Sequence, residues 1–153
     1  MAQRLGTIVK GGHQLNRSAM HLLHRAGQCA ADIFAAEAGL TGLTPRQFAI
    51  LIVLAEEEGL TQTELVERTG VDRSTLADIV ARLIARGLIQ RRRTKEDARA
   101  YAVKLTPQGV KALREAQPGA AEADTRLLAA LPAGKRQDFF DILNLIVTNG
   151  AKD

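Results

Sequence analysis

The chain has 153 residues, of which 46% are apolar and 25% are charged, a composition that suits one domain with a sizeable core and excludes compositional disorder. Aromatic residues contribute only 3%, so we expect an aliphatic and mostly helical core, and the single cysteine, Cys29, excludes an intramolecular disulfide. The net charge of +4 is a weak indication of a polyanionic partner, and without a long uncharged apolar run or a signal peptide we expect a cytoplasmic protein that does not contact membranes.

The first part of the chain predicts two helices. Residues from about 14 to 38 are rich in alanine and free of proline, and Gly39 is placed to end that helix. A second helix begins in "TPRQFAILIVLAEEEG". There Thr44 is a good N-cap, Pro45 fits the first helical position and Gln47 completes a capping box.

Two shorter helices follow, joined by a tight turn. In "TQTELVERTG", Thr61 caps the first one, Glu64 completes its capping box and Gly70 ends it. The second opens with Asp72 as its N-cap. Its apolar residues recur at the spacing of a helix that packs on one face, and they are Leu76, Ile79, Val80, Leu83 and Ile84. This pattern predicts a helix-turn-helix, although an ordinary pair of packed helices has the same pattern.

A hairpin and two further helices complete the chain. Gly87 ends the second short helix, and "LIQRRR" and "AYAVKLT" are β-compatible runs that flank a polar loop at about 94–99. Thr106-Pro107 then starts a helix that Pro118-Gly119 must kink or break, and "KRQDFFDILNLIV" predicts a last helix. The predicted fold is therefore mainly α with a small β-hairpin, in the order α-α-α-α-β-β-α-α.

The exposed face of the second short helix favours DNA binding. Hydrogen-bonding side chains crowd its first turn, which is the part that a recognition helix presents to base edges, and Arg82 and Arg86 further along suit phosphates. The hairpin would then be a wing, in which Arg99 enters a minor groove while Asp97 orients it; the alternative is a solvated basic loop. The expected DNA contacts are Thr61, Gln62, Thr63, Arg73, Ser74, Thr75, Asp78, Arg82, Arg91, Lys95, Asp97 and Arg99.

The stretch "GLTPRQFAILIVLAEEEGLTQTELVERTGVDRSTLADIVARLIARGLIQRRRTKEDARAYAVKLTPQG" resembles the MarR family of transcriptional regulators. Its most specific part is "DARAYAVKLTPQG", an Asp-x-Arg followed by an alternating strand that ends in Leu-Thr. The resemblance implies one MarR-type domain over residues 1–153, with a winged helix-turn-helix lobe at 44–106 and dimerisation helices at 5–40 and 107–150. It further implies an obligate homodimer that binds a pseudo-palindromic operator in double-stranded DNA.

The family's usual behaviour is repression relieved by a small ligand. The resemblance therefore implies a ligand-responsive repressor, released by an aromatic acid or a thioester that binds between the dimerisation helices and the DNA-binding lobe. We expect no cofactor and no catalysis, because the sequence has no phosphate-binding loop, nucleophile elbow or metalloprotease signature. The alternatives are a redox- or metal-responsive regulator of the same fold, and an architectural DNA-binding protein, which would usually carry a heavier positive charge.

Residues in and near the first predicted helix are candidates for sensing. His21 and His24 share a helix face, but no acid–histidine cluster accompanies them, so an effector pocket, a dimer seam or a plain surface position is favoured over a metal site. The expected effector contacts are His13, His21, His24, Arg25 and Phe48. The neighbours of Cys29 are small or neutral, so we expect a buried structural thiol rather than a peroxide sensor.

Overall fold

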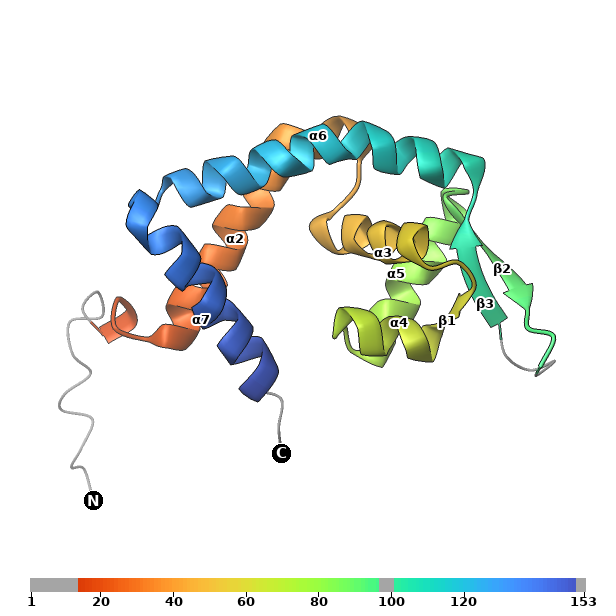
Figure 1. The fold of residues 1–153 in the computed structure, drawn as a ribbon, viewed down its shortest axis with the longest axis horizontal. Helices are drawn as coiled ribbons and strands as arrows, with labels where there is room; N and C mark the ends of the chain where they lie inside the picture. The colour runs from red at the N-terminus through yellow and green to blue at the C-terminus, as the bar shows by residue number, and fades with distance from the viewer. Residues whose placement is uncertain (1–13, 97–100, 151–153) are drawn as a thin grey trace, which may run out of the picture.

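Helices build most of the molecule, and a small antiparallel sheet stands at one end of it (Figure 1). The computed structural model describes residues 14–96 and 101–150. Its elements are α2 (Ala19–Ala38), η1 (Gly39–Thr41), α3 (Pro45–Glu56), β1 (Leu60–Thr61), α4 (Gln62–Thr69), α5 (Arg73–Ala85), β2 (Ile89–Arg93), β3 (Tyr101–Leu105), α6 (Pro107–Ala129), η2 (Ala133–Lys135) and α7 (Arg136–Asn149), where η marks a 3-10 helix. The predicted mainly α fold with a β-hairpin is confirmed.

The long helix α6 joins two parts of the molecule. In Figure 1 it arches across the top, with α2 and α7 below one end and the lobe of α3, α4, α5 and the sheet below the other. An ion pair of 3.0 Å between Arg126 and Glu37 links α6 to α2. Among the described residues, no single helix is long and apolar enough to cross a bilayer. One pair of consecutive segments, 19–41 and 45–56, has the required length and composition when taken together, but the pair is bent by 62°.

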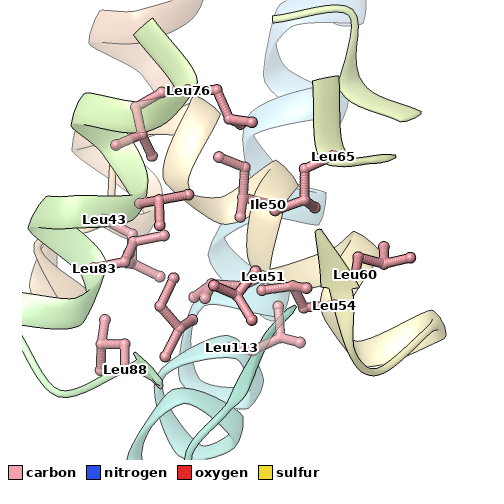
Figure 2. Close-up of a cluster of buried hydrophobic side chains, with 14 of the residues drawn as sticks. Leu43, Ile50, Leu51, Leu54, Leu60, Leu65, Leu76, Leu83, Leu88 and Leu113 are labelled. Atoms are coloured by element: carbon pink, nitrogen blue, oxygen red, sulfur yellow. The ribbon is translucent and has the colours of Figure 1, made fainter. Parts of the chain in front are cut away.

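An aliphatic core fills the lobe, where side chains from α3, α4, α5, α6 and the strands converge (Figure 2). Ile50, Leu51 and Leu54 of α3 are fully buried, as are Leu76 and Leu83 of α5. Each such side chain contributes about 1.5–3 kcal/mol when it leaves water. The predicted apolar stripe of α5 is confirmed, since four of its residues are buried and Ile84 packs against them. A smaller second cluster lies between α2 and α6 and contains Phe34, Ala38, Ala120 and Ala123.

Local capping determines where the helices of the lobe begin and end. Both predicted capping boxes form, Thr44 with Gln47 and Thr61 with Glu64, because each N-cap hydroxyl accepts a backbone N–H while the third helical residue bonds back. At the other end of α5, Gly87 has φ +72°, and its N–H donates to the carbonyl of Ile84 at 2.9 Å. This left-handed conformation favours glycine, and it turns the chain from α5 into β2.

The structure differs from the predicted elements at three places. The first long helix begins at Ala19 rather than near Gln14, because the hydroxyl of Ser18 accepts the backbone N–H of His21 at 3.2 Å and caps the helix there. A third strand, β1, pairs with β3 in the order β1-β3-β2. Its two residues are too few to show an alternating pattern.

The helix that starts at Pro107 is not broken at Pro118-Gly119, which is the third difference. It runs on to Ala129 as one arched helix (Figure 1). Proline has no N–H, so one backbone carbonyl in the preceding turn lacks its helical hydrogen bond. Because Pro118 is exposed, water can hydrate that carbonyl and the helix continues. Gly119 instead allows close packing, since a Cβ there would lie 2.3 Å from the carbonyl oxygen of Glu37.

Candidate nucleic-acid interface

The carboxylate of Asp72 organises the first turn of α5. Its Oδ1 accepts the backbone N–H of Thr75 at 3.0 Å and the hydroxyl of Ser74 at 2.9 Å. Hydrogen bonds from the side chain and backbone of Thr75, and then from Ser74, lower the pKa of Asp72 to about 2. Asp72 is therefore an anion at neutral pH, and the helix begins in a fixed orientation at Arg73, whose side chain is exposed.

A hollow of about 430 Å³ lies where the starts of α4 and α5 meet the sheet. It is lined by Thr61, Gln62, Thr63, Arg73, Arg91, Tyr101 and Val103. Two guanidinium groups and the N-terminal end of α4 thus face one concavity, an arrangement that attracts an anion such as a DNA phosphate. Glu64 partly offsets this charge, because its hydrogen bonds to the backbone and then the hydroxyl of Thr61 lower its pKa and keep it ionised.

The hairpin of β2 and β3 presents further cations. Arg91, Arg92, Arg93 and Lys95 are exposed, and the pairing of β2 with β3 places Arg93 opposite Tyr101. The guanidinium of Arg93 lies 5.9 Å from the centre of the Tyr101 ring, a cation–π contact that restrains it. Asp97 and Arg99, the expected tip contacts, lie outside the described residues.

A second cavity, of about 590 Å³, lies on another side of α5, where this helix approaches α2, the start of α3, and α6. Its apolar wall includes Phe34, Ile79 and Leu127, and its polar groups include Arg46, Gln47 and Asp124. Thr75, Asp78 and Arg82 also line it, and Arg82 Nε lies 3.0 Å from Asp78 Oδ2. The expected DNA contacts that line a cavity thus fall into two groups, one in the hollow beside the sheet and one at this second cavity, whereas Ser74 and Lys95 line neither.

Comparisons with known proteins identify the family. The MarR family model matches residues 41–100. The HTH-type transcriptional repressor NicR of Pseudomonas putida is 34% identical over 127 residues, which are 83% of this chain and 80% of NicR. The chain belongs to the MarR family. Members of this family are DNA-binding regulators of transcription rather than enzymes.

Two solved structures of MarR-type regulators have the same fold. The PcaV transcriptional regulator of Streptomyces coelicolor, in complex with its natural ligand, is 32% identical, with a TM-score of 0.82 over 89% of this chain and 96% of PcaV. The transcriptional repressor CouR, bound to a 23-mer DNA duplex, is 29% identical, with a TM-score of 0.79 over 90% of this chain and 97% of CouR. The fold of this MarR-family chain therefore occurs both with a ligand and with DNA.

Four of the residues that were expected to contact an effector lie in the described part of the chain, and none of them lines the cavity. His24 and Arg25 are exposed on α2, and His21 is half-buried. Phe48 lies behind the cavity wall, with its ring centre 5.7 Å from that of Phe34. His13 lies outside the described residues. The wall on α2 is instead formed by Gly27, Ala30, Ala31 and Phe34. Their i, i+3, i+4, i+7 spacing is the signal in the sequence that could have found it.

Two further side chains of this MarR-family chain differ from expectation. Cys29 is exposed in the described chain and is not the buried thiol that was predicted. Cys29 is exposed because it lies on a different face of α2 from Ala30 and Phe34, which line the cavity. Arg86 was expected at a phosphate, but its guanidinium donates to the backbone carbonyls of Thr41 and Gly42. Within the described ranges, no three His, Cys, Asp or Glu side chains are grouped to hold a metal ion.

Proposed function

We propose that the chain is a cytoplasmic, homodimeric repressor that binds a pseudo-palindromic operator and is released by a small aromatic acid or thioester. The observation that carries the proposal is the hollow in which Arg73 of α5, Arg91 of β2 and the start of α4 converge. A recognition helix inserts its first turn into the major groove while neighbouring cations hold the phosphates on either side. The exposed wing arginines continue this cationic surface, and the proposal extends to Asp97 and Arg99.

Exposed apolar side chains support the homodimer. The first half of α2 exposes Met20, Leu22 and Leu23, and α7 has no buried residue at all. The exposed apolar residues of α7 are Phe140, Ile142, Leu145, Ile146 and Val147. Both helices lie at the end of the molecule away from the sheet (Figure 1). Exposed apolar side chains on helices at the same end of the molecule are typical of an interface, and a second copy of the chain would cover them symmetrically.

The 590 Å³ cavity supports the small effector, since ligand sites commonly enclose about 300–1,000 Å³. The ring of Phe34 and the small residues of α2 suit a flat apolar group. Arg46 and Arg82 at its edge suit a carboxylate, while Asp78 and Asp124 narrow the positions in which an anion is accepted. Because α5 forms part of the wall, a ligand that fills the cavity bears directly on the recognition helix.

The DNA-binding proposal is tested with an operator selected from random duplexes by the protein itself. Arg73→Ala should weaken binding to that operator by roughly 1–3 kcal/mol more than binding to random DNA, as expected for a lost base contact. Arg91→Ala should weaken both and reduce the slope of log affinity against log salt by about 0.9. Arg114→Ala, an exposed arginine on α6, is the matched control. Equal losses on both DNAs for Arg73→Ala would make it a phosphate contact.

The effector proposal is tested by thermal shift with phenolic acids and their thioesters, each repeated with operator DNA present. An effector should stabilise the free protein and weaken the DNA complex. Ala31→Leu, which narrows the cavity, should abolish the shift, whereas Ala35→Leu on the exposed side of α2 should retain it. Zinc and hydrogen peroxide are tested alongside. A response to these alone would favour the metal- or redox-responsive alternative.

A further inference from the structure

Arg86 joins the end of the recognition helix to a distant part of the chain. It is the C-cap residue of α5. Its Nη2 donates to the carbonyl oxygen of Thr41 at 2.8 Å, and its Nη1 donates to that of Gly42 at 3.1 Å. Thr41 and Gly42 lie 45 and 44 residues earlier in the sequence, in the junction that leads from α2 through η1 to α3. The contact therefore spans the two parts of the molecule that α6 also connects.

The geometry of this contact fits a guanidinium group in particular. The two carbonyls end the helical segment of α2 and η1, where carbonyl oxygens lack helical partners and carry partial negative charge. Gly42 has φ +69°, a left-handed conformation that favours glycine. A Cβ at Gly42 would lie 3.4 Å from Nη2 of Arg86, so the guanidinium fits closely against the turn. The planar guanidinium group donates to two neighbouring carbonyl oxygens at once, and a lysine ammonium would do this less well.

Because Arg86 lies at the far end of α5 from Arg73, its contact influences where the first turn of α5 is placed. Arg86 and Arg73 lie at opposite ends of α5, whose 13 residues span about 20 Å. A tilt of about 6° at the Arg86 end therefore displaces the first turn by roughly 2 Å, which is enough to misplace a base contact. On the other side of the junction, Gly119 of α6 packs against Glu37 and Ala38 at the end of α2. The junction is thus fixed against α6, and Arg86 fixes α5 against the junction.

We infer that Arg86 is a positioning residue for operator recognition, which holds the direction of α5 without contacting DNA. The inference rests on the proposed function, because it takes the first turn of α5 as the part that reads the operator. It replaces the expectation that Arg86 binds a phosphate. The two roles predict different dependences on salt and on DNA sequence.

The test compares Arg86→Ala with wild type on the selected operator and on random DNA over a range of salt concentrations. A positioning role predicts about a threefold to tenfold loss on the operator, little loss on random DNA and an unchanged salt slope, because no phosphate contact disappears. A phosphate contact predicts equal losses on both DNAs and a slope reduced by about 0.9. That second result, or an unchanged ratio of operator to random affinity, overturns the inference.

Two further variants keep the test decisive. Arg86→Lys retains the positive charge but loses the planar guanidinium group. The positioning role therefore predicts an operator affinity between those of wild type and Arg86→Ala. A phosphate contact instead predicts an affinity near that of wild type. Arg86→Lys also carries the comparison if Arg86→Ala does not fold, which circular dichroism reveals. Arg114→Ala controls for the lost charge. If Arg73→Ala has no operator-specific effect, the proposed function fails; if Arg73→Ala has one and Arg86→Ala does not, only the present inference fails.

Discussion

Asp72 determines where α5 begins and, under the proposed function, which groups the first turn of α5 offers to DNA. Because the hydroxyl of Ser74 donates its proton to Asp72, only the oxygen lone pairs of Ser74 remain for a partner. Ser74 can therefore accept a hydrogen bond from an amino group of adenine or cytosine in the major groove. Arg73 beside it carries only donors, which suit guanine or phosphate. The carboxylate of Asp72 thus leaves Ser74 as an acceptor beside Arg73, which is a donor by its own chemistry.

The lowered pKa of Asp72 predicts a pH dependence of stability. The carboxylate form is favoured in the folded protein, so its contribution is present above about pH 4 and is lost as the pH falls toward the folded value of about 2. Asparagine also caps helices but does not titrate. We therefore expect the difference in melting temperature between wild type and Asp72→Asn to shrink between about pH 5 and pH 2. Thermal unfolding followed by circular dichroism measures it, with Glu67→Gln as a charge control. A difference that is constant with pH would contradict the assigned hydrogen bonds.

At the scale of the elements, α6 meets the end of α2 through a close backbone approach at Gly119. Gly119 lets α6 pack directly on the end of α2, and Ala120 and Ala123 continue the contact with Phe34 and Ala38. Helices that meet through small residues exclude water with little side-chain entropy lost. The position at 119 therefore matters for packing rather than for backbone freedom.

We expect glycine-to-alanine substitutions in α6 and α2 to have opposite signs. Alanine is the better helix former by roughly 0.5–1 kcal/mol, and a Cβ at Gly27 would have no atom within 4 Å, so Gly27→Ala should stabilise the protein. At Gly119 the Cβ would meet backbone atoms of Glu37, so Gly119→Ala should destabilise it by about 1–3 kcal/mol. Urea unfolding at one fixed protein concentration measures both. Stabilisation by both variants would show that α6 can move away from α2 at little cost.

The predictions that succeeded at this scale rest on local chemistry. Caps at Thr44, Thr61 and Asp72 and the stripe of α5 involve residues within one or two helical turns of each other, so the sequence alone contains them. The mainly α fold followed from these signals, and the family followed from the resemblance of a longer stretch, most specifically "DARAYAVKLTPQG". Two of the predictions that failed depend on distant partners, whereas the start of α2 is fixed locally by Ser18. β1 exists because Leu60 pairs with Val103, and α6 continues because Gly119 packs on Glu37. The cavity likewise combines four separate helices, so periodicity in any one of them shows only one wall.

For the whole molecule, the proposed dimer predicts which exposed apolar residues are needed for self-association. Leu145 on α7 is 60% exposed and Leu40 in η1 is 107% exposed, but only Leu145 lies on the proposed interface. Sedimentation at micromolar concentration should give twice 16.5 kDa for wild type and for Leu40→Glu. Leu145→Glu should give a lower mass, because it would bury a charge against apolar side chains of the partner. A wild-type monomer that binds its operator would overturn the dimer, and dissociation by Leu40→Glu would relocate it.

The arrangement of α6 and the α2–α3 junction has a mechanical consequence. The chain passes between the two hydrophobic clusters at only two places in the described residues, once through 39–43 and once within α6 between Ala116 and Ala120. These places adjoin, since Gly119 contacts Glu37 and Ala38, and Pro118 removes one helical hydrogen bond there. The two crossings therefore act as a single junction about which the lobe can rotate. The cavity lies beside that junction, at Phe34 and Ala123, whereas the wing lies at the far end of the lobe (Figure 1). Any change of angle at this junction would therefore displace the wing farther than the residues that line the cavity.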